Sequence, residues 1–183
     1  MSKGAKAVFL DRDGTINRDP GYLSDPGDLE LFDNTVEAVE VIKSQGFRIV
    51  VVSNQSGIGR GILTEINLAD IHKNLNQLLG GAIDAFYYCS HRPDENCKCR
   101  KPEPELLFVA ARELGLDLQS SIMVGDRLKD LQAGRRAGCS HCALVRTGMG
   151  ASEEAEVRRS EGADYVGSDL LEVAIWIKNG CMG

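Results

Sequence analysis

No apolar run in the sequence approaches the roughly 20 residues that a membrane-spanning helix needs. The first residues, MSKGAKAVFLDRDG, reach an acidic motif before any apolar stretch typical of a signal peptide. Positive charge is scarce as well, because 21 lysines and arginines stand against 27 acidic residues and leave a net charge of −6. Such a chain is a poor partner for nucleic acid or an anionic membrane. The sequence therefore predicts a cytoplasmic protein with neither partner.

The length of 183 residues fits one compact domain, so we expect a single domain over 1–183. Short apolar runs predict strands at Ala7–Leu10, Arg48–Val52, Ala85–Tyr88, Ser121–Val124, Ala143–Val145 and Tyr165–Val166. Helical spacing and capping residues predict helices that begin near Asn34, Thr64, Pro104 and Asp169. Because parallel neighbours need crossover connections, the alternation predicts a Rossmann-like three-layer α/β sandwich with a mostly parallel sheet.

Two acidic residues follow the first expected strand, in the string Asp11-Arg12-Asp13-Gly14. Side chains of extended chain repeat with period two, so Asp11 and Asp13 can point into one site. A carboxylate at Asp11 can attack phosphorus, while Asp13, held protonated nearby, can give its proton to the leaving group. The alternative is a solvated turn, in which Asp and Gly are also common.

Further polar residues stand near the ends of later strands, where parallel sheets gather their chemistry. Asp126 offers a second carboxylate for Mg²⁺, and Asp130 is a weaker candidate that equally suits a helix cap. The Ser53 hydroxyl and the amides after it can hold phosphoryl oxygens. Lys101 can neutralise phosphate charge, although Arg100 and Lys101 can also be an ordinary solvated pair.

Four side chains of metal-binding type fall within eleven residues: Cys89, His91, Cys97 and Cys99. Three sulfurs and one nitrogen are the donors that structural Zn²⁺ takes. A closed four-ligand site leaves no position for a reacting water, so we expect zinc to shape the loop 89–99 rather than to do chemistry. Cys139 and Cys142 flank His141 but offer no fourth ligand, and we expect them to be structural.

The order and spacing of these residues resemble the four motifs of the haloacid dehalogenase superfamily across most of the chain. The resemblance implies a magnesium-dependent phosphatase in which Asp11 is the nucleophile and Asp13 the acid and base. It further implies that Ser53 and Lys101 stabilise the phosphoryl group. The implied magnesium ligands are Asp11, Asp126 and the backbone carbonyl of Asp13.

Within the superfamily, the sequence is similar to the histidinol-phosphatase-like group, above all to its D-glycero-D-manno-heptose 1,7-bisphosphate 7-phosphatases. The shared strings are Ser-Asn-Gln-Ser-Gly-Ile-Gly-Arg-Gly from Ser53 and the Cys/His loop followed by Arg-Lys-Pro. This similarity implies a monomeric enzyme that removes the 7-phosphate of the sugar bisphosphate on the route to lipopolysaccharide core or S-layer glycan. The implied substrate contacts are Arg12, Asp19, Pro20, Gly21, Tyr22, Ser53, Asn54, Gln55, Ser56, Arg60, Arg100, Lys101 and Arg127.

Two features depart from that family. Arg127 stands where a lysine is common, although its guanidinium keeps the charge and can grip a phosphate. The metal loop, with five residues between His91 and Cys97, is shorter than in some relatives.

No stretch is long enough for a large cap domain, so we expect an open site. Histidinol-phosphate phosphatase is the nearest alternative, ahead of a nucleic-acid 3′-phosphatase and a non-catalytic protein that binds a phosphorylated ligand.

Overall fold

The computed structural model describes residues 4–160 and 162–181. Its strands form one six-stranded sheet in the order β3-β2-β1-β4-β5-β6, and every neighbouring pair is parallel. The strands are Ala7–Leu10 (β1), Arg48–Asn54 (β2), Ala85–Cys89 (β3), Ile122–Gly125 (β4), His141–Val145 (β5) and Tyr165–Gly167 (β6). The predicted parallel α/β sheet is confirmed.

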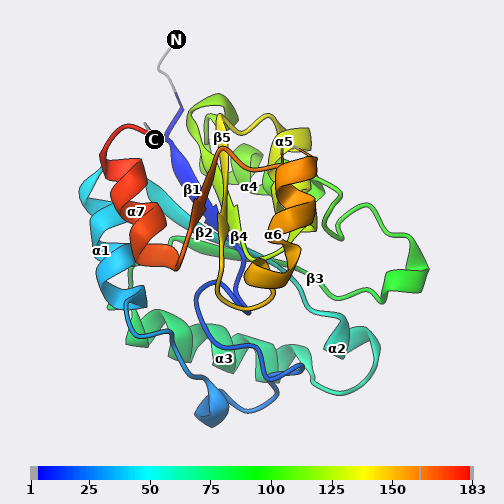
Figure 1. Ribbon diagram of the computed structural model, residues 1–183. Coiled ribbons are helices and arrows are strands. Elements are labelled where there is room, and N and C mark those ends of the chain that lie inside the picture. Colours follow the sequence, from blue (N-terminus) through cyan, green and yellow to red (C-terminus); the bar gives the residue numbers. More distant parts are fainter. Residues whose placement is uncertain (1–3, 161, 182–183) are drawn as a thin grey trace.

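Helices cover both faces of this sheet (Figure 1). They are Thr35–Ser44 (α1), Ser56–Gly59 (α2), Glu65–Leu78 (α3), Glu105–Leu114 (α4), Leu128–Ala137 (α5), Gly150–Arg159 (α6) and Leu170–Lys178 (α7). The helices α1 and α7 lie together on one face, and α4, α5 and α6 lie on the other. This is the three-layer sandwich that the sequence predicts.

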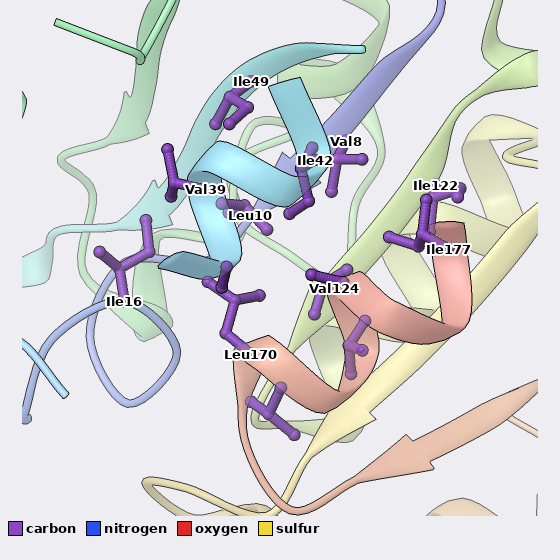
Figure 2. Packing of buried hydrophobic residues seen from close by; sticks show 14 of the residues in the cluster. Val8, Leu10, Ile16, Val39, Ile42, Ile49, Ile122, Val124, Leu170 and Ile177 are labelled. Atoms are coloured by element: carbon purple, nitrogen blue, oxygen red, sulfur yellow. The ribbon is translucent and has the colours of Figure 1, made fainter. Parts of the chain in front are cut away.

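Buried strand residues alternate between the two faces, as side chains of extended chain do. In β1, Val8 and Leu10 pack with α1 and α7, whereas Ala7 and Phe9 pack with α4 and α5. All four side chains are fully buried. Figure 2 shows the first of these two clusters, in which Ile42 of α1 points toward the side chains of β1. The continuous apolar run of β1 is thus explained by burial on both sides.

Local signals fix several helix ends. The Thr64 hydroxyl accepts a hydrogen bond from the Asn67 amide at 3.1 Å, and the Asn67 side chain accepts one from the Thr64 amide at 3.0 Å. Gly115 ends α4 with a φ of 63°, which favours glycine. Asn34 precedes α1 as expected, but its side chain does not cap that helix. It donates instead to the Asp169 carboxylate at 3.1 Å and so joins the starts of α1 and α7.

The structure also extends some expected elements and adds others. The strand β2 continues through Ser53 and Asn54, because Asn54 still pairs with Cys89 of β3. The helices α2 and α6 were not expected from the sequence. The helix α6 buries only Gly150 and Val157, so its apolar periodicity is too weak to be recognised.

The strand order decides where a site can form. The chain runs from β1 outward through β2 to β3 and then returns to the other side of β1 with β4. The direction of winding therefore changes between β1 and β4, and open α/β sheets bind ligands outside the carboxyl ends of such strands. The loops that follow β1, β2 and β4 consequently share one edge of the sheet.

The connections around this edge carry little additional structure. The segment 11–34 contains one short 3-10 turn, Pro26–Asp28, and the connection from β2 to β3 contains α2 and α3. In the described part of the chain these connections form no second sheet, as expected for a protein without a large cap domain. Among the same residues, every helix is too short or too polar to cross a bilayer.

Replacing Leu107 by alanine should lower the free energy of unfolding by about 2–5 kcal/mol, because the truncation leaves a cavity in the layer between α4 and the sheet. Leu107 is fully buried, whereas the adjacent Phe108 is 40% exposed. The control Phe108→Ala should therefore cost less than about 1 kcal/mol. Urea denaturation of both variants checks this, and equal losses would contradict the described packing.

Candidate active site

Three carboxylates meet at the carboxyl edge of the sheet. Asp11 directly follows β1, Asp126 directly follows β4, and Asp130 lies in the first turn of α5. All three residues are buried, and their oxygens lie within 4.8 Å of one another. The structure therefore brings together two acids that are far apart in the sequence. Asp130 has two roles, because it belongs to this cluster and also caps the start of α5. Its Oδ2 accepts a hydrogen bond from the Arg127 amide at 3.1 Å.

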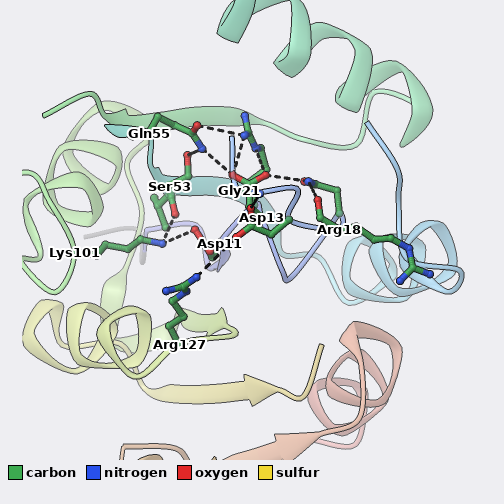
Figure 3. A network of polar contacts seen from close by, with 12 residues as sticks. Asp11, Asp13, Arg18, Gly21, Ser53, Gln55, Lys101 and Arg127 are labelled. Carbon is green, nitrogen blue, oxygen red and sulfur yellow. Dashed lines mark hydrogen bonds and ion pairs between the residues drawn. The ribbon is translucent and has the colours of Figure 1, made fainter. Parts of the chain in front are cut away.

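Lys101 supplies the positive charge of this cluster (Figure 3). Its Nζ lies 2.6 Å from Asp11 Oδ1 and 2.8 Å from Asp130 Oδ1, and it donates to the Val52 carbonyl at 2.7 Å. The side chain is fully buried. Burial alone would lower the pKa of this ammonium group, but the two carboxylates outweigh burial and raise the pKa of Lys101. Lys101 is therefore held as a cation.

One lysine does not balance three buried carboxylates. Burial raises the pKa of Asp11 to about 6 although Lys101 lowers it, and burial together with the charge of Asp11 raises the pKa of Asp126 to about 7. Asp126 Oδ2 accepts a hydrogen bond from the Met149 amide at 2.8 Å. Its Oδ1 is buried and has no hydrogen-bond partner among the described residues. Oxygen donors with excess negative charge and a free oxygen fit a Mg²⁺ ion.

Two glycines let the backbone pass close to Asp126. A Cβ atom at Gly14 or at Gly148 would collide with Asp126 Oδ2, and both glycines have positive φ angles, of 86° and 56°. The Thr147 hydroxyl donates to the Gly14 carbonyl at 2.6 Å and joins the two segments. The loop before α6 is therefore part of the site, although no motif in the sequence indicates it.

The Asp13 carboxylate lies outside the acid cluster and is held by other groups. Arg12 donates to both of its oxygens, at 3.0 and 2.8 Å, while Asn17 donates at 2.9 Å and Gln55 at 3.0 Å. Burial would raise the pKa of Asp13, but the charge of Arg12 and these hydrogen bonds outweigh it and lower the pKa. The structure thus holds Asp13 as a carboxylate, whereas the sequence analysis expects a protonated side chain.

His72 of α3 stacks on Phe86, with ring centroids 4.2 Å apart and an interplanar angle of 13°. Its Nε2 and the Nη1 of Arg12 are both buried without a hydrogen-bond partner among the described residues. Burial lowers the pKa of His72 to about 3, and the charge of Arg12 adds to this effect. His72 is consequently neutral. The sequence does not single out His72, because a histidine on an amphipathic helix belongs to no recognisable motif.

A cavity of about 290 Å³ adjoins Asp11 and Lys101. The expected site residues that line it are Asp11, Asp13, Asp19, Gly21, Tyr22, Asn54, Gln55, Ser56, Arg60, Arg100, Lys101 and Arg127. Four lining residues were not identified from the sequence, namely Leu23, Gly57, Pro93 and Lys129. The cavity is therefore built from the loops after β1, β2, β3 and β4.

Three of the expected substrate contacts do not line the cavity. Arg12 is fully buried beside Asp13, and Pro20 is exposed at the surface. Ser53 is 1% exposed, and its hydroxyl accepts a hydrogen bond from the Gln55 amide at 3.2 Å. Arg12 and Ser53 therefore lie behind the cavity wall, where they hold Asp13 and Gln55, whereas Pro20 has no such contact among the described residues.

Asn54 does line the cavity, and its side chain also anchors the loop that carries Lys101. The Asn54 amide nitrogen donates to the Lys101 carbonyl at 3.1 Å, and its oxygen accepts from the Lys101 backbone amide at 3.0 Å. The end of β2 and the loop before α4 are therefore fixed to each other by two hydrogen bonds.

The Cys/His loop brings its four expected ligands together. The sulfurs of Cys89, Cys97 and Cys99 lie 3.0–3.6 Å apart, and His91 Nδ1 lies 3.3 and 3.5 Å from two of them. The three cysteines are free thiols, and all four donor atoms fall within 4.8 Å of one another. This donor set could hold a metal ion. Arg100 reaches back to donate to the His91 carbonyl at 3.2 Å, so the loop also supports the cavity wall.

Cys139 and Cys142 form no comparable site. Both are buried free thiols, and burial raises the pKa of each, that of Cys142 to about 12. The His141 ring packs edge-on against Trp176 at 5.7 Å. Within residues 4–160 and 162–181, the potential metal ligands gather only at the acid cluster and at the Cys/His loop. This supports the structural interpretation of the two cysteines.

Comparison with known proteins identifies relatives over nearly the whole chain. A family profile described as HAD-hydrolase-like matches residues 98–173. A D-glycero-beta-D-manno-heptose-1,7-bisphosphate 7-phosphatase from Photorhabdus laumondii is 43% identical, with 97% of this chain and 98% of that protein aligned. The phosphatase of the same name from Escherichia coli K12 is 39% identical, with 97% and 96% aligned.

A solved structure shows the same arrangement of elements. The D,D-heptose 1,7-bisphosphate phosphatase from B. bronchiseptica, crystallised with magnesium and phosphate, superposes with a TM-score of 0.88. It is 35% identical in sequence, and the match covers 96% of this chain and 99% of that one. Sequence and fold therefore agree over essentially the full length of both proteins.

Replacing His72 by phenylalanine should make the stability of the protein less sensitive to acid. Because the pKa of His72 is lowered from 6.5 to about 3, the unfolded chain takes up a proton that the folded chain refuses. The stability linked to His72 is therefore complete above 6.5 and is lost as the pH falls toward about 3. Urea denaturation between about pH 7 and about pH 5 measures this slope, and identical slopes would contradict the assignment.

Proposed function

The chain belongs to the heptose-1,7-bisphosphate 7-phosphatase family of HAD-like hydrolases, and from this premise we propose that it hydrolyses the 7-phosphate of D-glycero-β-D-manno-heptose 1,7-bisphosphate. The β anomer follows the names of the curated relatives. The observation that carries the proposal is the cavity itself, which combines the cluster of Asp11 and Lys101 with an excess of basic side chains. The first feature suits phosphoryl transfer, and the second suits a substrate with two phosphates.

Asp11 is the proposed nucleophile. One of its carboxylate oxygens forms a bond to phosphorus while the bond from phosphorus to the sugar oxygen breaks, which gives an aspartyl-phosphate and an alkoxide. Asp13 gives its proton to that alkoxide and then takes a proton from the water that hydrolyses the aspartyl-phosphate. Lys101 stabilises the negative charge of the transferring group, and Ser53 supports the site by accepting a hydrogen bond from Gln55, which lines the cavity. Inorganic phosphate and heptose 1-phosphate are the products.

The acid role requires Asp13 to change its surroundings. In the structure its carboxylate is paired with Arg12 and hydrogen-bonded to Gln55, and both contacts oppose protonation. We propose that Asp13 leaves these two partners when substrate enters, takes up a proton from solvent water and turns toward the leaving oxygen. Gln55 lines the cavity and can then donate its freed amide to the substrate instead.

Magnesium is the proposed catalytic ion. Asp11, Asp126 and the backbone carbonyl of Asp13 would hold it, in line with the unpartnered Asp126 Oδ1 and the magnesium in the B. bronchiseptica structure. Bound there, the ion supplies positive charge that neutralises the phosphoryl oxygens and keeps Asp11 ionised. Asp130 serves instead to hold Lys101.

The charge of the cavity favours a bisphosphate over histidinol phosphate. Five basic residues line it against three acidic ones, and Lys101 is already engaged by Asp11 and Asp130. The remaining cations attract a second phosphate, whereas they repel the ammonium group of histidinol phosphate. A nucleic-acid 3′-phosphatase is disfavoured by the net charge of −6.

Zinc is the proposed occupant of the Cys/His loop. Three sulfurs and one imidazole nitrogen match the donors of closed, tetrahedral zinc sites. Pro93 and Arg100 of the same segment line the cavity, so the metal would shape the substrate site without taking part in chemistry. The single domain over 1–183, the monomeric state and the cytoplasmic location stay predictions.

Replacing Asp11 by asparagine should abolish magnesium-dependent release of phosphate from heptose 1,7-bisphosphate, by about a thousandfold or more, because an amide cannot form the phosphoenzyme. Purified wild-type protein should also hydrolyse this substrate far faster than histidinol phosphate in parallel assays. Released phosphate is measured for both substrates at equal enzyme concentration.

The matched control is Asp70→Asn, which removes an exposed carboxylate on α3 that neither belongs to the acid cluster nor lines the cavity. This control should keep full activity, and thermal melting should show that Asp11→Asn still folds. Unaltered turnover in Asp11→Asn would refute the mechanism. A preference for histidinol phosphate would refute the proposed substrate.

Replacing Cys97 by serine should remove the loop metal and destabilise the protein, because a hydroxyl is a poor ligand for zinc. Wild-type protein should contain about one zinc per chain, as closed four-ligand sites do. Elemental analysis and thermal melting measure both effects. The control Cys181→Ser lies outside the cluster and should retain the metal. Purified wild-type protein without zinc would refute the proposal.

A further inference from the structure

Lys129 lines the cavity at the start of α5, three residues after Asp126. It was not among the residues expected to contact substrate, and the sequence gives no signal that distinguishes it from a solvated lysine on a helix. In the structure its side chain is partly buried in the cavity wall. Lys129 is therefore a cation at the mouth of the proposed active site.

The ammonium group of Lys129 has no partner in the part of the chain that the structure describes. Lys101 is paired with Asp11 and Asp130, and Arg127 lies 3.8 Å from an oxygen of Asp19. Lys129 forms neither an ion pair nor a side-chain hydrogen bond among the described residues, although it is adjacent to Asp130 in the sequence. Lys129 therefore lines the cavity without a counter-ion among these residues.

Such a placement disfavours the charged form of the side chain. Burial lowers the pKa of Lys129, and the charges of Lys101 and Arg127 lower it further, although Asp130 and Asp11 oppose them. A partly buried cation gains most from an anion that enters the cavity, because the anion then replaces lost solvation. The empty space beside Lys129 therefore suits an anionic group of the substrate.

We infer that Lys129 binds the phosphate that is not hydrolysed, which is the 1-phosphate of the proposed bisphosphate substrate. The reacting phosphate must lie against Asp11, where Lys101 already supplies the cation at 2.6 Å. Among the described residues, Lys129 forms no ion pair or hydrogen bond with the acids of that centre, so its ammonium group is available to the second phosphate. This inference rests on the proposed function, and it assigns Lys129 to specificity for a bisphosphate over a monophosphate.

The test compares two substrates that differ only in the second phosphate, heptose 1,7-bisphosphate and heptose 7-phosphate. Lys129→Met keeps most of the side-chain volume but removes the charge. It should lower the ratio of the two kcat/KM values, bisphosphate over monophosphate, by about tenfold or more, because a charge-assisted hydrogen bond is lost. Lys129→Arg should restore most of this ratio. Product inhibition by heptose 1-phosphate should weaken by a similar factor in Lys129→Met.

The matched control is Lys73→Met, which removes an exposed lysine on α3 and should retain the wild-type ratio. An unchanged ratio in Lys129→Met would overturn the inference. So would an equal fall of kcat/KM for both substrates, because Lys129 would then act on the reaction centre. A wild-type enzyme that releases no phosphate from the bisphosphate would instead refute the proposed function, and the inference with it.

Discussion

The buried ammonium group of Lys101 is the interaction on which the site depends. It is bound by Asp11, Asp130 and the Val52 carbonyl, so it joins the ends of β1 and β2 to the start of α5. Without this cation the acid cluster would contain only negative charge, and leaving one buried charge without its partner costs about 3–5 kcal/mol. The same contact therefore stabilises the fold and fixes the proposed nucleophile in place.

The position of Lys101 is determined from two sides. Asn54 holds its backbone from the end of β2 through two hydrogen bonds. The Cys/His loop immediately precedes it, and Arg100 donates to the His91 carbonyl of that loop. A metal in the loop would act on chemistry only indirectly, by limiting where Arg100 and Lys101 can lie. A bound metal would also give a defined shape to this short polar loop, which has few apolar side chains to pack.

The sequence allows the sheet, both of its covered faces and the meeting of Asp11 with Asp126 to be predicted, because strand ends in a parallel sheet share one edge. It does not reveal the ionised state of Asp13, which depends first on the contact of its carboxylate with the Arg12 guanidinium and then on hydrogen bonds from Asn17 and Gln55. Lys129 and His72 are missed for a related reason. Charged or aromatic residues on amphipathic helices are common, and only tertiary contacts distinguish these two.

The openness of the cavity determines whether the catalytic cycle needs a conformational change. In the part of the chain that the structure describes, no folded insertion covers the opening, which is bordered by loops, by the short helix α2 and by the start of α5. Many enzymes must close and reopen a lid in every cycle, and this movement often limits their rate. Here the hydrolytic water can arrive and the product can diffuse away without such a movement. The corresponding cost is that charge and fit alone must protect the proposed phosphoenzyme from solvent.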